Sequence, residues 1–366
     1  MKNNIYSFEE CLEIASENGG KNHLVLGNGF SVALFPKIFN YKVLAEKIKS
    51  EKIKNLFTQF KTNDFEYVLR EVTRALKVIK SYKNTKVLLK EISQDIKDLK
   101  KTLIDIITIS HPETPSAITE AQYISCYEFL KYFEKGKKYT FNYDLILYWV
   151  YMHFLDDNEF RLKSDDGFRH PVGDESIVTW EIGQEHKQNL YYLHGALHIF
   201  SDDSEIEKYT WINTGDKLTE QIKKSLKDEK YPVFITEGSK QQKKSRINNN
   251  AYLARSFASL KGITGNVFIF GHSLRDEDDH VFKYLNHKSN VKNIFISIYG
   301  DKNTEENRRI LKKIKSWEKE QSTKKSPKNY YVYQAESAKV WDREISDDIL
   351  AKQFKKESAD IPEGFF

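Results

Sequence analysis

Short apolar runs alternate with longer helical stretches along most of this chain, and that alternation limits its fold more than any other feature. The runs are rich in β-branched and aromatic residues without polar alternation, which is typical of strands covered on both faces. They lie at residues 23–27, 137–141, 190–194, 232–236, 266–271 and 293–298. The helical stretches lie at residues 42–60, 64–80, 86–110, 116–134, 144–155, 216–228, 249–260, 278–287 and 303–318. This order predicts an α/β fold with a Rossmann-like, mostly parallel sheet of about six strands and helices on both faces.

One block, from residue 41 to residue 135, departs from the alternation, because helix follows helix there without a convincing strand. We therefore expect residues 1–40 and 136–366 to form one α/β domain and residues 41–135 to form an all-helical insertion or subdomain. The helix at 86–110 carries more apolar residues than one helix face normally needs inside its own domain. This surplus predicts a homo-oligomer with the region at an interface. The apolar positions are Val87, Leu88, Leu89, Ile92, Ile96, Leu99, Leu103, Ile104, Ile106 and Ile107.

Composition narrows the class of protein. The net charge of +5 is the small difference between 58 basic and 53 acidic residues, so direct nucleic-acid binding is not expected. Two cysteines, Cys11 and Cys126, can form neither a disulfide framework nor a four-thiolate zinc site. They predict a reducing, cytoplasmic setting. The longest apolar run, residues 145–155, has 11 residues, whereas a membrane span needs ~20.

The amino-terminal segment is not of signal-peptide type. It has no continuous apolar core, and Ser7 stands three residues ahead of Glu10, the spacing of a helix capping box. We therefore expect a capped helix there and no membrane association.

The stretch HLVLGNGFSVALF, residues 23–35, places Gly27 and Gly29 on either side of Asn28 where the first strand is expected to end. A glycine turn between a strand and a helix lets the backbone approach a phosphate, and the helix start offers free N–H groups. The third position of the usual pattern is Ser31 rather than glycine. Glycine is also common in such turns for backbone reasons alone, so both interpretations stay open.

Polar residues follow three further predicted strands. They are Asn142 and Asp144 after residues 137–141, His194 and Gly195 at the end of residues 190–194, and Gly271, Ser273 and Asp276 after residues 266–270. Each group has a structural explanation: a helix cap for the first, a core histidine for the second and a solvated cap for the third. Because the carboxyl ends of the strands line the ligand crevice of an open α/β sheet, we expect the groups to converge on one site.

The ordered set resembles the sirtuin fold. It comprises Gly-x-Gly-x-Ser at 27–31, Thr-x-Asn-x-Asp at 140–144, His-Gly at 194–195 and Gly-x-Ser at 271–273. It is most similar to the sirtuin-like NAD-hydrolase domains of bacterial antiphage systems, in which Gly-x-Ser precedes a Leu-x-Asp stretch. The resemblance implies cleavage of NAD to nicotinamide and ADP-ribose by an abortive-infection effector. It also implies control by assembly, by a HerA-type ATPase partner or by a phage-derived activator.

The resemblance also implies roles for single residues. Gly27, Asn28, Gly29 and Ser31 would surround the pyrophosphate of NAD, and Gly271, Ser273 and Asp276 would lie against the adenosine half. Thr140 and Asn142 would line the nicotinamide-ribose pocket, with Asn142 holding the attacking water. Asp144 would organise that pocket, and His194 would act as the general base.

The four-cysteine zinc module of protein-deacylating sirtuins has no counterpart here, so neither deacylation nor bound zinc is expected. Two other classes stay open. A Rossmann oxidoreductase is disfavoured, because no acidic residue ends an obvious second strand ~20 residues after the glycines. A non-catalytic nucleotide sensor or nucleic-acid-binding module would use the basic segments 240–246 and 322–328, but such loops are more often simply solvated.

Overall fold

The computed structural model describes residues 4–350, apart from 40–45, 63–64, 156, 158, 171–176, 181, 184–186, 202–204, 211–216, 229, 231, 236–246 and 288–289. Its main sheet has seven strands, all parallel, in the order β1-β12-β11-β10-β2-β3-β6. The strands are β1 (Ile5–Tyr6), β2 (Asn22–Leu26), β3 (Lys138–Thr140), β6 (Leu190–Tyr192), β10 (Thr264–Phe270), β11 (Asn290–Ile298) and β12 (Asn329–Gln334). The prediction of a Rossmann-like α/β fold is confirmed.

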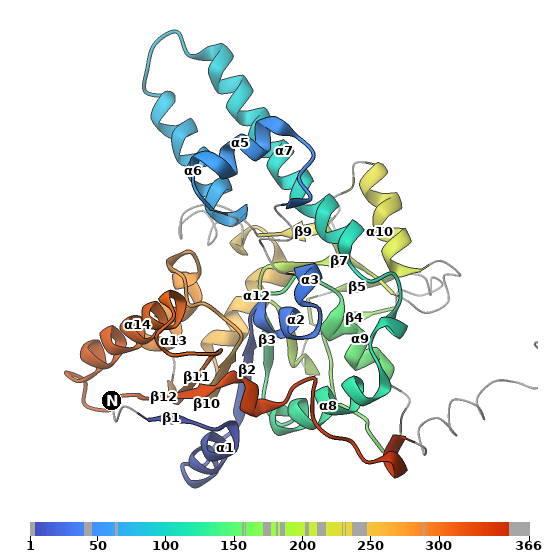
Figure 1. Cartoon of the computed structure of the whole chain (residues 1–366), viewed down its shortest axis with the longest axis vertical. Coiled ribbons are helices and arrows are strands. Elements are labelled where there is room, and N and C mark those ends of the chain that lie inside the picture. Colours follow the sequence, from blue (N-terminus) through green and yellow to red (C-terminus); the bar gives the residue numbers. More distant parts are fainter. Residues whose placement is uncertain are drawn as a thin grey trace, which may run out of the picture.

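Helices cover both faces of this sheet (Figure 1). On one face lie α1 (Phe8–Glu17), α8 (Glu120–Leu130) and the short helix η2 (Lys131–Phe133); on the other lie α12 (Ala251–Lys261), α13 (Asp279–His287) and α14 (Glu305–Gln321). Phe8 and Phe133 pack on Phe268 of β10, with ring centroids 5.8 and 5.4 Å apart. Trp317 packs on Tyr330 of β12 from the other side. The capping box at the start of α1 is present, as its sequence predicts.

A second, antiparallel sheet has the order β4-β5-β8-β7-β9. Its strands are β4 (Phe168–Arg169), β5 (Ile177–Trp180), β7 (Gly195–Ser201), β8 (Ile206–Tyr209) and β9 (Pro232–Phe234). The prediction that the strand at 232–236 belongs to the main, mostly parallel sheet is wrong, because β9 pairs antiparallel with β7 in the second sheet. The cause is the turn at Gly195, where φ is +84° and an added Cβ would lie 1.8 Å from the Val233 carbonyl oxygen. This turn directs the chain out of β6 and into the second sheet.

The predicted helical block divides into two parts. Helices α5 (Glu51–Gln59), α6 (Phe65–Ile79) and α7 (Lys86–Ser110) include an arm in which α6 and α7 extend away from the sheet (Figure 1), whereas α8 packs on the sheet domain. Along α7, Leu99 and Leu103 are buried, but Val87 and Leu88 near the tip are 74% and 44% exposed. The apolar surplus is therefore buried within the chain at the base of the arm and exposed at its tip.

The remaining described elements are short. They are α2 (Gly29–Leu34), α3 (Pro36–Phe39), η1 (Pro115–Ala117), α9 (Ile146–His153), α10 (Leu218–Lys227), η4 (Asp276–Asp278) and η5 (Ala335–Ala338). None of the described helices is both long and apolar enough to cross a lipid bilayer.

Candidate functional site

The glycines that follow β2 sit where two turns of the backbone touch. The turn between β2 and α2 lies against the turn after β10, and the Gly29 N–H donates to the Gly271 carbonyl at 2.8 Å. A Cβ on Gly27 would lie 2.5 Å from that same carbonyl oxygen, and a Cβ on Gly29 would lie 2.6 Å from the Gly271 Cα. Close packing of the two turns is thus sufficient to require both glycines, whether or not a phosphate binds there.

The backbone N–H groups of Gly27, Gly29, Phe30 and Ser31 are bonded within the chain. Gly27 donates to the Phe270 carbonyl, Phe30 to Gly27, and Ser31 to Asn28, at 2.9 to 3.1 Å. The Asn28 side chain donates to the Phe39 carbonyl at 3.1 Å. These donors are used within the fold, so the role of the turn in holding pyrophosphate stays a prediction. A diphosphate bound at this edge would need other cationic or N–H groups.

Ser31 lies inside the site and links two predicted residues. The Asn142 amide nitrogen donates to Ser31 Oγ at 2.9 Å, and Ser31 Oγ donates to Asp144 Oδ2 at 2.6 Å. The other carboxylate oxygen of Asp144 accepts the Ile146 N–H at 3.0 Å and so caps the start of α9. A carboxylate only accepts hydrogen bonds, so this chain of bonds fixes the Asn142 nitrogen toward Ser31 and its oxygen away from it.

Burial affects two members of this chain of bonds, the Asn142 oxygen and the Asp144 carboxylate. The Asn142 Oδ1 atom is buried and has no hydrogen-bond partner among the described residues. Burial also raises the pKa of Asp144 to about 6, against the opposing effects of its hydrogen bonds from Ser31 and Ile146. Thr140, at the end of β3, is buried and accepts the Asn142 backbone N–H at 3.0 Å. The group therefore holds a buried amide oxygen whose hydrogen-bonding capacity the described residues leave unused.

His194 belongs to a second group, which packs on Phe141. Its ring lies 4.7 Å from that of Phe141, the residue before Asn142, and His272 packs on Phe141 at 4.5 Å. His194 Nε2 lies 3.3 Å from His280 Nε2 and 3.6 Å from Asp278 Oδ1. The ends of β3, β6 and β10 thus bring histidines and a carboxylate together around the Phe141 ring.

The remaining predicted residues lie along the turn after β10. Gly271 has φ +67° and donates to the Ser297 hydroxyl at 2.9 Å, while Ser273 is half-buried. The Asp276 carboxylate points to the surface, where Lys313 binds it at 3.0 Å and lowers its pKa. No observation places Asp276 against a ligand, so its adenosine role stays a prediction.

Sequence reasoning missed three residues of the second group. His272, Asp278 and His280 all lie in the segment GHSLRDEDDH, whose acidic part has the pattern of a solvated helix cap. They are nevertheless buried, with exposed fractions of 8%, 8% and 4%. Two histidines flanking an acidic run were the available signal, because buried histidine next to carboxylate is common at functional sites.

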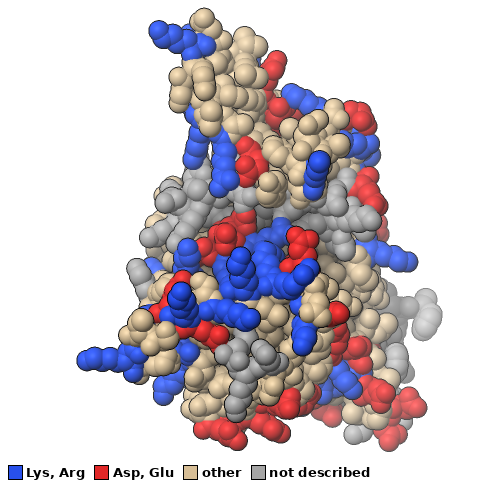
Figure 2. All heavy atoms as spheres, turned by 60° about the vertical axis from the view of Figure 1, so that its left-hand side comes forward, with Lys and Arg blue, Asp and Glu red and all other residues tan. Residues whose placement is uncertain are grey.

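Cations surround the same turn. Arg275, Lys283, Arg309 and Lys313 are close enough to one another or to Asp276 to shift pKa values there. Burial, followed by the Arg275 guanidinium, lowers the pKa of Arg309. Figure 2 is turned so that the α13 and α14 side of the molecule comes forward, and it shows Lys and Arg side chains gathered in the middle of this face. A polyanion would be attracted to this edge. The basic segment 240–246 lies outside the described residues. Lys328 of segment 322–328 lines a pocket beside β12.

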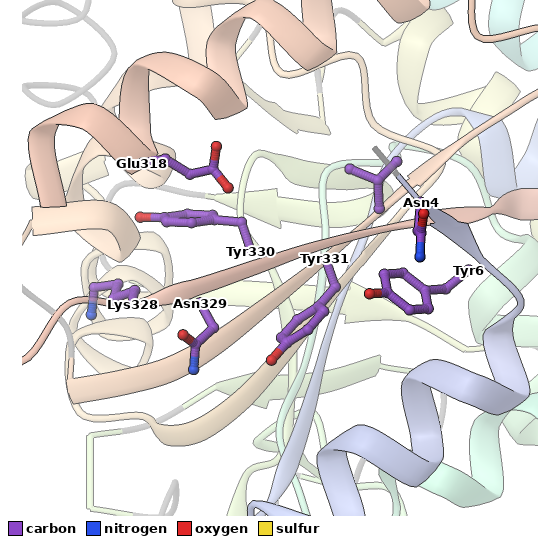
Figure 3. A pocket seen from close by; sticks show the side chains of 8 residues that line it. Asn4, Tyr6, Glu318, Lys328, Asn329, Tyr330 and Tyr331 are labelled. Carbon is purple, nitrogen blue, oxygen red and sulfur yellow. The ribbon is translucent and has the colours of Figure 1, made fainter. Parts of the chain in front are cut away.

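A pocket of about 250 Å³ lies elsewhere, at the amino-terminal half of β12 (Figure 3). Tyr6 and Tyr331 form one side of it, with ring centroids 6.0 Å apart. Lys328 forms another part of its lining; its ammonium donates to the Val291 carbonyl at 2.7 Å, and burial lowers its pKa to about 8. The residues that line it come from β1, β12, α14 and the segments beside them, so this pocket is separate from the predicted site.

The fold and the site together define a Rossmann-like α/β protein with buried amide, carboxylate and imidazole groups at the carboxyl edge of its parallel sheet. The family described as "Domain of unknown function (DUF4917)" matches residues 24–341. The chain therefore belongs to this family. Among curated proteins, no relative matches it.

Proposed function

We propose that this protein hydrolyses NAD at the bond between nicotinamide and ribose, releasing nicotinamide and ADP-ribose. The observation that carries the proposal is the buried Asn142 amide, whose nitrogen is fixed by Ser31 and whose oxygen has no partner within the described part of the chain. Leaving such an oxygen unpaired costs free energy. A water molecule or a substrate hydroxyl is therefore its expected partner.

The reaction suits the groups present. Nicotinamide leaves as a neutral molecule, so the site needs a positioned water and a proton acceptor more than it needs an acid. Asn142 Oδ1 would accept a hydrogen bond from the attacking water without competing for its proton. His194, beside Phe141, would take the proton as the anomeric carbon is attacked.

Asp144 would not contact the reacting atoms and would act through Ser31 on the Asn142 amide. As a carboxylate it accepts the Ser31 hydroxyl, and this direction of bonding keeps the Asn142 oxygen turned toward the substrate. A protonated Asp144 could donate to Ser31 instead, and Ser31 could then donate to the amide oxygen. The ionised form is therefore the one that holds the amide correctly.

The cations at the turn after β10 support a dinucleotide substrate. NAD carries a diphosphate, and Arg275 and Arg309 lie near each other at this edge. These guanidinium groups supply charge that the inward-pointing N–H groups of the β2–α2 turn do not. The resemblance in sequence further leads us to propose an antiphage effector that works as a homo-oligomer and is controlled by a HerA-type ATPase or a phage-derived activator.

Steady-state kinetics of two variants test the proposal. Asn142→Ala and His194→Ala should each lower the kcat for nicotinamide release by ~10²-fold or more, the scale of a lost general base or its positioned water. Asn303→Ala, which removes an exposed amide from the turn before α14, is the control and should behave as wild type. Wild-type rates in folded Asn142→Ala protein would refute the role of the amide.

A further inference from the structure

Three ligating atoms from distant parts of the chain face one another at the edge of the sheet. His194, Asp278 and His280 each offer one atom, and these atoms all lie within 4.8 Å of one another. His194 comes from the end of β6, whereas Asp278 and His280 come from η4 and α13 after β10. All three side chains are buried.

The hydrogen bonds around the trio determine which ring nitrogens carry protons. His280 Nδ1 lies 3.3 Å from the Glu277 carbonyl oxygen, which can only accept, so in the neutral ring Nδ1 carries the proton and Nε2 holds the lone pair. That lone pair points at His194 Nε2, 3.3 Å away. Two imidazole nitrogens at this separation repel unless a proton or a metal cation lies between them.

His272 orients the carboxylate of the trio. Its Nδ1 accepts the Leu274 N–H at 2.9 Å, so its Nε2 carries the proton and donates to Asp278 Oδ2 at 3.3 Å. The other oxygen, Oδ1, is the one that faces His194 at 3.6 Å. A backbone carbonyl on one histidine and a second histidine on the carboxylate are the kind of outer contacts that orient metal ligands in proteins.

Two of the three separations between the ligating atoms agree with a shared ion, and the third is within 4.8 Å. Zinc binds imidazole nitrogen at about 2.0–2.1 Å, and tetrahedral geometry then separates two ligand atoms by about 3.4 Å. The separations of 3.3 and 3.6 Å lie on either side of this value. Two imidazoles with one carboxylate favour a transition metal over magnesium or calcium, which prefer oxygen ligands.

We propose that His194, Asp278 and His280 bind one divalent transition-metal ion of the zinc class. Three protein ligands leave a fourth position for water or another small ligand. The sequence expectation of no zinc rested on the cysteine count and on the lack of a histidine or cysteine cluster with ligand spacing. The cysteine count excludes a thiolate site but does not bear on a site made from histidines and an aspartate. The two parts of this site are also too far apart in sequence for ligand spacing to reveal it.

In the metal-free protein His194 Nε2 carries the proton that it donates to His280, so Nδ1 is the His194 nitrogen that can take a proton. A neutral imidazole that binds metal through Nε2 carries its own proton on Nδ1, so bound metal and proton acceptance exclude each other at His194. Zinc should therefore suppress the hydrolysis of NAD, and the metal-stripped protein should be the active form. This consequence rests on the proposed function, whereas metal binding itself does not.

Calorimetric titration of the full-length, EDTA-treated and desalted protein with zinc chloride tests the site. We expect one equivalent to bind, and cobalt in its place should give the visible absorption bands of a tetrahedral ion. Asp278→Asn and His280→Ala should each weaken zinc binding at least ~10-fold, and His272→Ala should weaken it ~10- to 100-fold. The matched control is His287→Ala, which removes a half-exposed histidine 3.1 Å from Glu320 and should bind zinc as wild type does.

Asp278→Asn keeps the size of the side chain, so it remains informative if His280→Ala fails to fold. Circular dichroism of each metal-free variant shows whether it is folded. No zinc binding by the wild type, or wild-type affinity in folded Asp278→Asn protein, would overturn the proposal. Zinc binding that leaves NAD cleavage unchanged would instead argue against His194 as the base.

Discussion

Replacing Gly27 with alanine tests whether the contact between the β2–α2 turn and the turn after β10 is as tight as described. The added methyl would lie 2.5 Å from the Gly271 carbonyl oxygen and 2.7 Å from the His272 Cα. Both are backbone atoms, so one of the two turns must move. Overpacking of this kind typically costs about 1–3 kcal/mol. For a large domain each kcal/mol lowers Tm by roughly 2–4 °C, so we expect Gly27→Ala to melt about 2–12 °C below wild type.

The control is Gly262→Ala at the end of α12. Gly262 has φ −92°, which alanine adopts without strain, and the nearest atom to an added Cβ is 3.7 Å away. This change should be neutral or stabilising, by up to about 1 kcal/mol, because alanine restricts the unfolded chain. Differential scanning fluorimetry and urea unfolding measure both variants. If Gly27→Ala is as stable as Gly262→Ala, the glycines are not required by packing, and the description of the two turns is incorrect.

Four further predictions concern charge, assembly and metal. Burial raises the pKa of Asp144 from an ordinary 3.8 to about 6. The free energy of unfolding should therefore be about 3 kcal/mol larger below pH 4 than at neutral pH, and this extra stability is lost as pH rises through 6. Asp144→Asn should flatten this pH dependence in urea unfolding. The same ionisation should make wild-type NAD cleavage fall below pH 6. The double change Val87→Glu and Leu88→Glu at the tip of α7 should yield a folded, smaller species by light scattering if the tip is an interface; an unchanged mass would exclude it. EDTA should leave the far-ultraviolet spectrum unchanged and should not lower nicotinamide release, whereas loss of either would mean that a metal is required.

Elements with strong local patterns could be predicted from the sequence, whereas partners across the fold could not. The helix expected at 86–110 is present as α7 with the same bounds, because its apolar residues recur at helical spacing over many turns. β1, by contrast, has only two residues and exists through its pairing with β12. Nothing local marks such a short strand. β9 was predicted in the wrong sheet because its partner is β7, and β7 leaves the main sheet at the turn at Gly195, some forty residues earlier in the chain.

The site shows the same division. The pattern placed Asn142, Asp144 and His194 at strand ends, where the structure has them. It did not indicate that Ser31 bonds both Asn142 and Asp144 from a different turn. Nor did it indicate that His280 faces His194. Such pairs are set by how neighbouring strands align in the sheet, which a single sequence does not specify.

The identity of the bond cleaved in NAD tests the central proposal most directly. Mass spectrometry of a reaction with the metal-stripped protein, alone and with added activator candidates, separates four outcomes. We expect equimolar nicotinamide and ADP-ribose, with no product in Asn142→Ala or His194→Ala reactions run for the same time. Formation of AMP would show attack at the diphosphate, and formation of NADH with an added reductant would show hydride transfer. Either result, or intact NAD throughout, would contradict hydrolysis of the nicotinamide–ribose bond.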